Sequence, residues 1–394
     1  MNDCDTRAGD TAFDFDTIID RRNTNSSKWR LYGEDVLPMW VADMDFKSPP
    51  CVVRALHERV EHGVFGYEGH APDLPELIVD RLARVFDWHV EPDAIVFTPG
   101  VVIGFNLAVR ALVAPDEALL IQTPVYGPIR HAAKIAGVLG QSMALTRQAD
   151  GRYTIDMDLF EATITDQTKL FLLCSPHNPV GRVFTREELQ TMGEICLRHD
   201  IMICSDEIHG DLTFSGHPHT PIAAISPELE TRTITLMAPS KTYNIAGLDC
   251  GFAVIPDPEL REQYNVARGG LVGLPNLMGY TAARAAYSEG EPWLAAALRY
   301  LEANRDFTVA YVRENMPELH VASPEGTYLA WIDCRDAGLL DSPQGFFLDK
   351  GKVALNDGTP FGPSGKGFAR LNFGCPRALL EEGLGRMHTA LESR

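Results

Sequence analysis

The chain has 394 residues, of which 45% are hydrophobic and 23% are charged, a composition typical of a soluble globular protein of roughly two to three domains. Lysine and arginine together number 35 against 54 aspartates and glutamates, so the formal net charge is −19. Because a protein that binds nucleic-acid phosphates needs a basic face, and no basic run occurs, nucleic acid is not expected as a partner.

In chain order, helical periodicity alternates with short apolar runs from about residue 48 onward. Strands are predicted at residues 94–97, 118–122, 169–174, 201–205 and 233–237, and helices at residues 76–86, 101–113 and 186–199. Apolar strands separated by helices of about ten or more residues imply an α/β fold, in which helices cover both faces of a mostly parallel sheet. In such sheets, ligands bind at the carboxyl ends of the strands.

The pattern changes in the last quarter of the chain. Residues 293–315 are predicted to form one long helix, followed by strands at residues 320–322, 327–332 and 369–372 and by a final helix from Arg377. These elements predict a smaller α+β domain, against which the loop-rich N-terminal segment is expected to lie. We therefore assign residues 47–284 to a large domain, and residues 1–46 and 285–394 to a small domain.

The N-terminus and the cysteines favour a cytoplasmic protein. The first five residues are polar and acidic, and no apolar stretch is long enough to span a bilayer, so no membrane partner is expected. The eight cysteines form no CxxC pair and no clustered framework, and several lie in apolar segments. Buried free thiols in a reducing compartment are therefore expected, and no residue is assigned as a metal ligand.

Polar and aromatic side chains with chemical potential follow the predicted strands. Asp206 and Lys241 each come after an apolar strand, and Lys241 lies in a turn rich in serine and glycine. Tyr126 and Asn178 follow two further strands, and Gly100 precedes a helix whose first N–H groups suit a phosphate. Each feature alone has a plainer explanation, such as a helix cap or a surface lysine. At one sheet edge together, however, they would surround a desolvated amine, which is what Schiff-base chemistry requires.

This ordered series resembles the fold-type I enzymes that use pyridoxal 5′-phosphate (PLP), and within them the aminotransferase class I/II superfamily. The resemblance extends from about Phe13 to the end of the chain and is closest to the MalY/PatB-type cystathionine β-lyase (C–S lyase) branch. It implies a large domain with a mostly parallel, seven-stranded sheet. The matching segments are Pro38-Met-Trp-Val-Ala-Asp-Met-Asp-Phe46, His62-Gly-Val-Phe-Gly-Tyr67, Thr98-Pro-Gly-Val-Val102, Ser175-Pro-His-Asn-Pro-Val-Gly181, Ser205-Asp-Glu-Ile-His209, Ser240-Lys-Thr-Tyr-Asn-Ile-Ala-Gly247, Glu325-Gly-Thr-Tyr-Leu-Ala-Trp331 and Phe368-Ala-Arg-Leu-Asn-Phe-Gly-Cys-Pro376.

The resemblance implies a role for each matching residue. Lys241 would carry PLP as a Schiff base and move protons during the reaction, and Asp206 would keep the pyridine nitrogen protonated. Arg370 would bind the substrate α-carboxylate through its planar guanidinium. The remaining contacts implied are Asn178 and His209 beside the ring 3′-oxygen, Tyr126 stacked on the ring, the N–H groups of Val101 and Val102 on the phosphate, and Tyr67 on the phosphate of a neighbouring subunit. The role of Tyr67 implies a homodimer.

Two positions depart from the pattern of many aminotransferases. Those enzymes have a serine three residues before the Schiff-base lysine and an arginine eight residues after it, both bound to the phosphate. Here the two positions hold Ala238 and Asp249. Because a phosphate dianion repels a carboxylate, we expect Asp249 to turn away or to pair with a cation, and Ser240 to supply the missing hydroxyl. Loss of the arginine favours the lyase branch.

The sequence thus predicts a PLP-dependent β-lyase that cleaves an L-cysteine S-conjugate, such as cystathionine, to a thiol, pyruvate and ammonia. Lys241 would remove the Cα proton. The alternatives are an aminotransferase, or another PLP reaction on a specialised cysteine conjugate of secondary metabolism, and more remotely a regulatory binding protein on the same fold. Residues 23–32 and 356–363 are expected to line the substrate mouth. There Arg30 stands where the branch usually has an acid, which allows a negatively charged distal group on the substrate.

Overall fold

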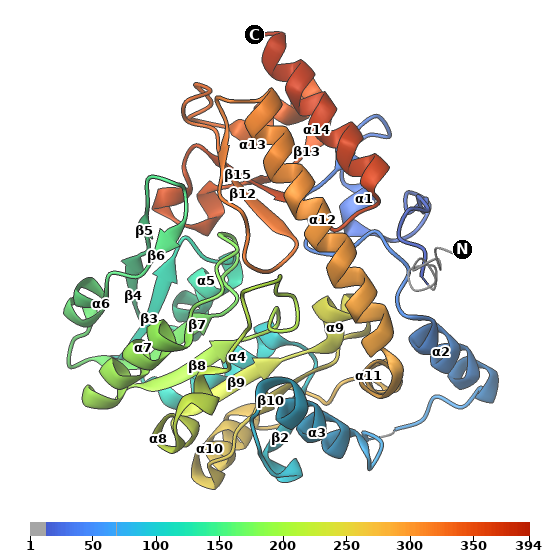
Figure 1. Cartoon of the computed structure of the whole chain (residues 1–394). Coiled ribbons are helices and arrows are strands. Elements are labelled where there is room, and N and C mark those ends of the chain that lie inside the picture. The colour runs from blue at the N-terminus through green and yellow to red at the C-terminus, as the bar shows by residue number, and fades with distance from the viewer. Residues whose placement is uncertain (1–12, 68) are drawn as a thin grey trace, which may run out of the picture.

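A seven-stranded sheet forms the centre of the larger part of the molecule (Figure 1). The structure, a computed structural model, describes residues 13–67 and 69–394. Five strands run parallel and side by side, whereas β10 is antiparallel to both of its neighbours. In spatial order the strands are β2 (Ile95–Thr98), β10 (Gly251–Val254), β9 (Thr233–Met237), β8 (Met202–Asp206), β7 (Thr168–Cys174), β3 (Ala118–Thr123) and β4 (Leu139–Ala144).

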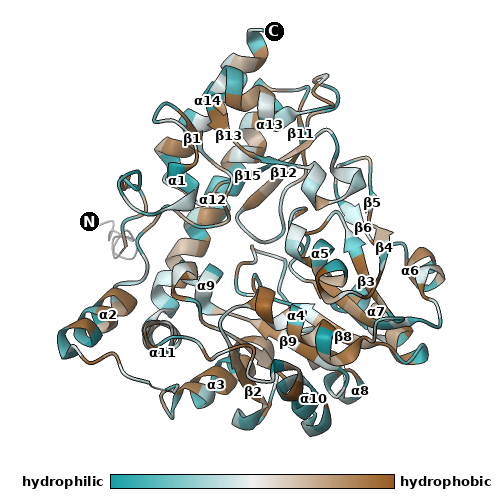
Figure 2. Cartoon of the chain, turned by 180° about the vertical axis from the view of Figure 1, so that it is seen from behind, coloured by the Kyte–Doolittle hydropathy of each residue, from teal (hydrophilic) through white to brown (hydrophobic). Residues whose placement is uncertain are grey.

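Helices cover both faces of this sheet, which together with it form the large unit. One apolar layer packs the sheet against α4 (Val101–Leu112), α5 (Gly127–Ala136) and α10 (Pro258–Arg268), and a second packs it against α6 (Met157–Thr163) and α7 (Arg186–Arg198). The central strands are therefore buried on both sides, which explains their continuous apolar runs. In Figure 2, α4 is mostly brown, whereas helices farther out show both brown and teal surfaces.

The strands and helices predicted for this unit are all present, and their ends differ from the predicted ones by at most two residues. Sequence patterning missed β4 and β10. Strand β4 lies at the sheet edge with mostly exposed side chains and has no regular alternation of apolar residues. Strand β10, which follows the turn after Lys241, begins with Gly251, and glycine weakens the sequence signal of a strand.

A second, four-stranded antiparallel sheet forms the centre of the small unit. Its order is β11 (His320–Val321), β12 (Leu329–Asp333), β15 (Phe368–Asn372) and β14 (Asn356–Asp357). The long helix α12 (Glu291–Asn315) and the last helix α14 (Arg377–Glu392) pack on it and on each other (Figure 1). Strand β1 (Leu37–Pro38) pairs with β13 (Val353–Ala354). The N-terminal segment thus lies against the C-terminal part of the chain, as the sequence predicts.

The cysteines are structural. All seven cysteines in the part of the chain that the structure describes are buried free thiols, as predicted, and Cys4 lies outside that part. Burial raises the pKa of the Cys174 and Cys204 thiols well above the ordinary value, so these groups are poor nucleophiles. Among the described residues, no helix is long and apolar enough to cross a membrane.

The loop after β7 connects the two units through Gly181. Its carbonyl accepts hydrogen bonds from the N–H groups of Glu325 (2.8 Å) and Gly326 (3.1 Å), and its φ of +72° lies in the left-handed region that favours glycine. A Cβ atom at this position would lie 2.7 Å from Cβ of Pro324. The buried Arg182, next in sequence, donates from Nε to Glu325 at 2.9 Å. Only glycine therefore allows this close approach.

We predict that Gly181→Ala lowers the free energy of unfolding by roughly 2–4 kcal/mol, because it adds backbone strain and a steric clash at a buried position. The measurement is the midpoint of urea-induced unfolding, with circular dichroism as the signal. Gly273→Ala is the matched control, since no atom lies within 4 Å of an added Cβ there, and it should change the free energy by less than about 0.5 kcal/mol. Equal midpoints for the two variants would contradict this interpretation of Gly181.

Candidate active site

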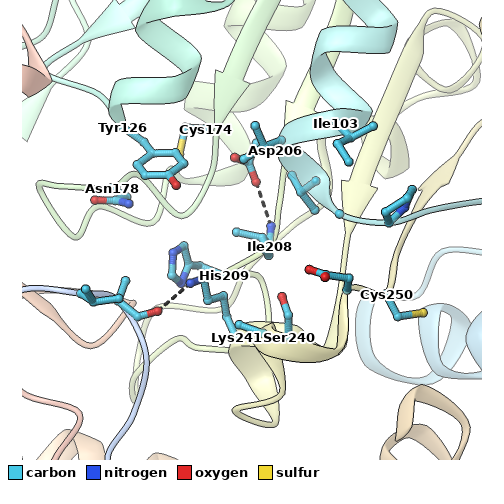
Figure 3. Close-up of a pocket in the computed structure, with 18 of the residues that line it drawn as sticks. Ile103, Tyr126, Cys174, Asn178, Asp206, Ile208, His209, Ser240, Lys241 and Cys250 are labelled. Atoms are coloured by element: carbon cyan, nitrogen blue, oxygen red, sulfur yellow. Dashed lines mark hydrogen bonds between the residues drawn. The ribbon is translucent and has the colours of Figure 1, made fainter. Parts of the chain in front are cut away.

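A cavity of about 580 Å³ lies at the carboxyl ends of the parallel strands, and residues of both units line it. Tyr126 follows β3, Asn178 follows β7, and Asp206 ends β8, with His209 three residues further on. Figure 3 shows these four side chains around one space, with Lys241 on its lower side. The parallel topology explains the convergence, because all these strands end at the same edge of the sheet.

The remaining predicted residues reach the cavity from three other elements. Val101 and Val102 begin α4, Ser240 and Lys241 lie on the short helix α9 (Pro239–Thr242), and Arg370 is in the middle of β15. Tyr67 is the exception, because it is fully exposed and does not line this cavity in the single chain. The structure thus brings together every predicted site residue except Tyr67.

Lys241 presents a partly desolvated amine to the cavity. Its Nζ donates a hydrogen bond to the carbonyl oxygen of Ala42 at 2.6 Å (Figure 3). Burial lowers the pKa of the amine to about 8, an effect that Arg370 strengthens and that Asp43 and Asp206 oppose. About a tenth of the amine is therefore unprotonated at pH 7, far more than for an ordinary lysine, and this free base is a nucleophile toward a carbonyl carbon.

Asp206 is a buried carboxylate that lacks a cationic partner among the described residues. It is 4% exposed, and its Oδ1 accepts a hydrogen bond from the N–H of Ile208 at 3.2 Å. Burial raises its pKa to about 7, and the nearby Glu207 acts in the same direction. A positively charged ligand atom beside Asp206 would stabilise the ionised carboxylate. The site therefore favours a ligand with a basic nitrogen at this end.

Arg370 is buried, and its hydrogen-bond partners are neutral. Its Nη1 donates to Oδ1 of Asn178 (2.9 Å), and its Nη2 donates to Oδ1 of Asn356 (2.5 Å) and to the carbonyl of Trp40 (3.0 Å). Its Nε is buried without a hydrogen-bond partner. Burial lowers the pKa of the guanidinium only to about 10, so it stays charged at neutral pH. An orphaned N–H on an uncompensated cation fits a carboxylate ligand.

The orientation of Asn178 follows from this contact. Arginine has only donors, so the amide oxygen of Asn178 must face Arg370 and its NH₂ group is directed elsewhere. The neighbouring His209 has a buried Nδ1 without a hydrogen-bond partner, and burial lowers the pKa of the ring to about 3. A neutral imidazole and an amide NH₂ group are thus available to an oxygen-bearing ring in the cavity.

The phosphate end differs from the expectation. Gly100 precedes α4, and Ser240 lines the same cavity, so both backbone N–H groups and a hydroxyl are present. Asp249 also lines the cavity, and no ion pair among residues 13–67 and 69–394 includes it. The structure therefore does not show the expected pairing of Asp249 with a cation, and its turning away from the phosphate stays a prediction. Ala238 packs instead into the apolar layer beneath α4.

The predicted substrate mouth is only partly correct. Residues 356–363 contribute Asn356 to the cavity, but none of residues 23–32 lines it. Arg30 is exposed, and its Nη1 donates to Oδ1 of Asn25 at 3.0 Å. Within the single chain Arg30 is therefore not placed to contact a substrate, and the charge expectation built on it finds no support.

Sequence reasoning missed the contribution of the N-terminal segment. Trp40, Val41 and Ala42 line the cavity, and two of their carbonyls accept hydrogen bonds from Arg370 and Lys241. Residues 38–46 match the family, but backbone acceptors carry no residue-type signal, so the sequence did not indicate that these carbonyls contact the site. Asn356 was missed as an individual residue for a similar reason, since nothing in its local sequence marks it.

These features together fit PLP. The cofactor has an aldehyde for the Lys241 amine, a basic ring nitrogen for Asp206, a ring oxygen for Asn178, and a phosphate for the start of α4. Within the described residues, no group of three or more histidine, cysteine or acidic side chains is arranged to hold a metal ion. The charged and hydrogen-bonding groups around the cavity are therefore suited to bind an organic anion with a basic ring.

Comparison with known proteins identifies the family. The model of the aminotransferase class I and II family matches residues 34–387, so the chain belongs to this family. It is 41% identical over 388 residues to the cystathionine β-lyase PatB of Bacillus subtilis, with 96% of this chain and 99% of that protein covered. It is 34% identical over 397 residues to Protein MalY of Escherichia coli, with 97% of this chain and 99% of that protein covered.

Solved structures agree with this assignment. The structure of OvoB is 44% identical, with a TM-score of 0.93, and the match covers 97% of this chain and all of that one. Cystalysin from Treponema denticola, whose structure contains PLP, is 35% identical with a TM-score of 0.94 over 97% of this chain and all of that one. The resemblance and the fold class predicted from the sequence are therefore confirmed.

We predict that Asp206→Asn stabilises the protein without cofactor at alkaline pH. The folded-state pKa of Asp206, about 7, lies above the ordinary value near 4, so folding binds a proton, and the stability linked to this group falls as pH rises from about 4 to 7. The variant lacks this loss. The free energy of unfolding of the variant should equal that of the wild type near pH 4.5 and be higher by about 2–4 kcal/mol at pH 8.

Urea midpoints of both cofactor-free proteins at the two pH values measure this difference. If the urea midpoints of the wild type and the variant changed equally between the two pH values, the burial of an unpaired carboxylate at this position would be contradicted.

Proposed function

We propose that this protein is a PLP-dependent carbon–sulfur β-lyase that cleaves an L-cysteine S-conjugate, such as cystathionine, to a thiol, pyruvate and ammonia. The observation that carries the proposal is one cavity that holds the Lys241 amine, the unpaired carboxylate of Asp206 and the free Nε of Arg370. Relatives named cystathionine β-lyase, which the chain matches over nearly its whole length, support the choice of reaction.

The proposed cofactor contacts follow from the donors and acceptors around the cavity. Lys241 would bind PLP covalently, and Asp206 would accept a hydrogen bond from the protonated ring nitrogen. Asn178 would donate its free NH₂ group to the ring 3′-oxygen, with His209 close by. The aromatic side chain of Tyr126 would cover one face of the ring. At the phosphate, the proposed donors are the N–H groups of Val101 and Val102 and the hydroxyl of Ser240.

Arg370 would orient the substrate by its α-carboxylate. The Asn178 and Asn356 amides bind the two terminal nitrogens of the guanidinium, which leaves Nε free for a carboxylate oxygen. Bound PLP supplies an electron sink that accepts the electron pair released when the Cα–H bond breaks. Lys241 would take that proton, a task that suits an amine with a pKa of about 8.

The leaving group sets the expected substrate class. A thiol has a pKa near 8.5, far below that of water, so a thiolate leaves from Cβ much more readily than hydroxide at neutral pH. Sulfur conjugates of cysteine are therefore better substrates for β-elimination than serine. Asn356 and Trp40 lie beside Arg370 on the cavity wall, so the group attached to sulfur would extend past them.

We also propose a cytoplasmic homodimer in which Tyr67 reaches the phosphate in the other subunit. Tyr67 is fully exposed, and the neighbouring Val64 and Phe65 are each 60% exposed. Adjacent exposed apolar side chains are typical of an interaction surface. Tyr67 has no contact with the cavity of its own chain, which supports a role across a subunit boundary. The buried free thiols support a reducing compartment.

The proposal predicts that cystathionine, or another cysteine S-conjugate, yields pyruvate and thiol in equal amounts in the presence of PLP. Pyruvate is followed by coupled reduction with lactate dehydrogenase, thiol by a chromogenic disulfide, and the cofactor by its absorbance. Lys241→Ala should lose this activity because it removes both the covalent site and the proton acceptor. Lys134→Ala, which changes a lysine that does not line the cavity, is the matched control and should retain activity.

Two outcomes would contradict the lyase proposal. Accumulation of pyridoxamine phosphate and an oxo acid, without thiol release, would identify an aminotransferase. If no conjugate or amino acid were turned over and Lys241→Ala left the biological role of the protein unchanged, the regulatory alternative would be favoured.

A further inference from the structure

Residues 39–46 are here called the strap; residues 40–42 line the cavity and contact its two cationic side chains. The carbonyl of Ala42 accepts the hydrogen bond from Lys241 (2.6 Å), and the carbonyl of Trp40 accepts one from Arg370 (3.0 Å). The strap thus contacts both the amine that would react and the guanidinium that would bind the substrate. Together with Asn178 and Asn356, which also bind Arg370, the strap helps to hold these two groups in place relative to each other.

Both backbone and side-chain hydrogen bonds hold the strap in place. At its two ends, the N–H groups of Met39 and Asp45 donate to the carbonyls of Ala354 and Gly374. Nδ2 of Asn372 on β15 donates to the carbonyls of Val41 (2.5 Å) and Asp43 (2.7 Å). The side chain of Asn244, which follows α9, bonds both the N–H and the carbonyl of Met44. Two acidic side chains of the strap, Asp43 and Asp45, form further contacts with charged groups behind it.

A cluster of four charged residues lies behind the strap. Lys28 Nζ and Asp45 Oδ2 are 2.6 Å apart, and both side chains are almost fully buried. Arg21 contacts Asp43 (2.7 Å) and Asp45 (2.5 Å), and the indole N–H of Trp29 donates to Asp45 at 2.8 Å. Two cations and two carboxylates make the cluster neutral. Burial of Lys28 or Asp45 alone would be strongly unfavourable, so the cluster holds together as a unit.

One carboxylate of this cluster, that of Asp43, affects the pKa of the Lys241 amine. Asp43 is the carboxylate with the largest effect, and it raises the pKa of the amine against the effect of burial. Burial raises the pKa of Asp43 itself, but Lys28 and Arg21 hold it below its ordinary value. The charged or titratable groups that face Lys241 are Asp43 from the strap, Asp206 and His209 from β8 and its following loop, Tyr328 beside β12, and Arg370 from β15.

We propose that Arg21, Lys28 and Asp45 are positioning residues of this site. Together with Asp43 they fix the strap carbonyls against Lys241 and Arg370, and they balance the negative charge beside the reacting amine. The inference rests on the proposed function, because it takes Lys241 as the residue that binds PLP.

The test changes the charge of the cluster in opposite directions in the PLP-loaded enzyme. Asp43→Asn removes a negative charge, and Arg21→Gln removes a positive one. Both side chains are 21% exposed, so these changes are milder than loss of Lys28 or Asp45. The readout is the pH at which the absorbance of the lysine-bound cofactor changes on protonation. Asp43→Asn should lower this midpoint by about 0.5–1 pH unit, and Arg21→Gln should raise it by about as much.

A second readout reports on position rather than charge. A loosened strap frees Arg370, so KM for the cysteine conjugate should rise about 3–10-fold in Arg21→Gln, with a smaller change in kcat at the variant's own pH optimum. Arg21→Lys should restore the wild-type midpoint because it keeps the charge. Arg198→Gln, which breaks an exposed ion pair with Glu161 on the outer helices, is the control and should change neither quantity.

The outcomes separate this inference from the proposed function. A wild type without a lysine-bound cofactor spectrum would contradict the proposed function itself. A wild type that titrates, with both variants at the same midpoint and KM, would show that the cluster has no influence on the site and would overturn the inference. Midpoints that move in the same direction in both variants would also overturn it, because loss of structure rather than charge would then be the cause.

Discussion

The site depends on one constraint, the burial of an amine and a carboxylate at the same edge of a parallel sheet. Asp206 ends β8 and Lys241 follows the neighbouring strand β9, so the topology brings them to one cavity. Desolvation favours the uncharged form of both groups, which leaves a nucleophilic amine and a carboxyl group that forms no ion pair among the described residues. A ligand with an aldehyde and a basic ring nitrogen satisfies both groups at once, and PLP is such a ligand.

The sequence predicted the features that depend on periodicity and order. The apolar runs of β3, β7, β8 and β9 are buried on both faces, so pattern alone located them. Because parallel strands present their carboxyl ends at one edge, the order of Tyr126, Asn178, Asp206 and Lys241 was enough to predict a shared cavity. The division into domains at residues 46/47 and 284/285 stays a prediction.

What the sequence could not give arises from backbone groups and from contacts distant in the chain. The acceptors for Lys241 and Arg370 are carbonyls of the strap, which any residue type would supply. Arg30 was expected at the cavity because residues 23–32 were expected to line the substrate mouth, but helix α1 (Ser27–Arg30) directs Lys28 to Asp45 and leaves Arg30 exposed. The position of Asp249 in the cavity depends on the turn after α9, which residue types alone do not specify.

The central claim is that PLP binds covalently to Lys241, and chemical trapping tests it most directly. The PLP-loaded protein is reduced with borohydride, which makes the carbon–nitrogen bond permanent, and its peptides are analysed by mass spectrometry. The chain has eight lysines, and the mass of the modified peptide identifies which of them carries the cofactor. The account predicts the cofactor mass on Lys241 alone. The mass on another lysine, or on none, would contradict it.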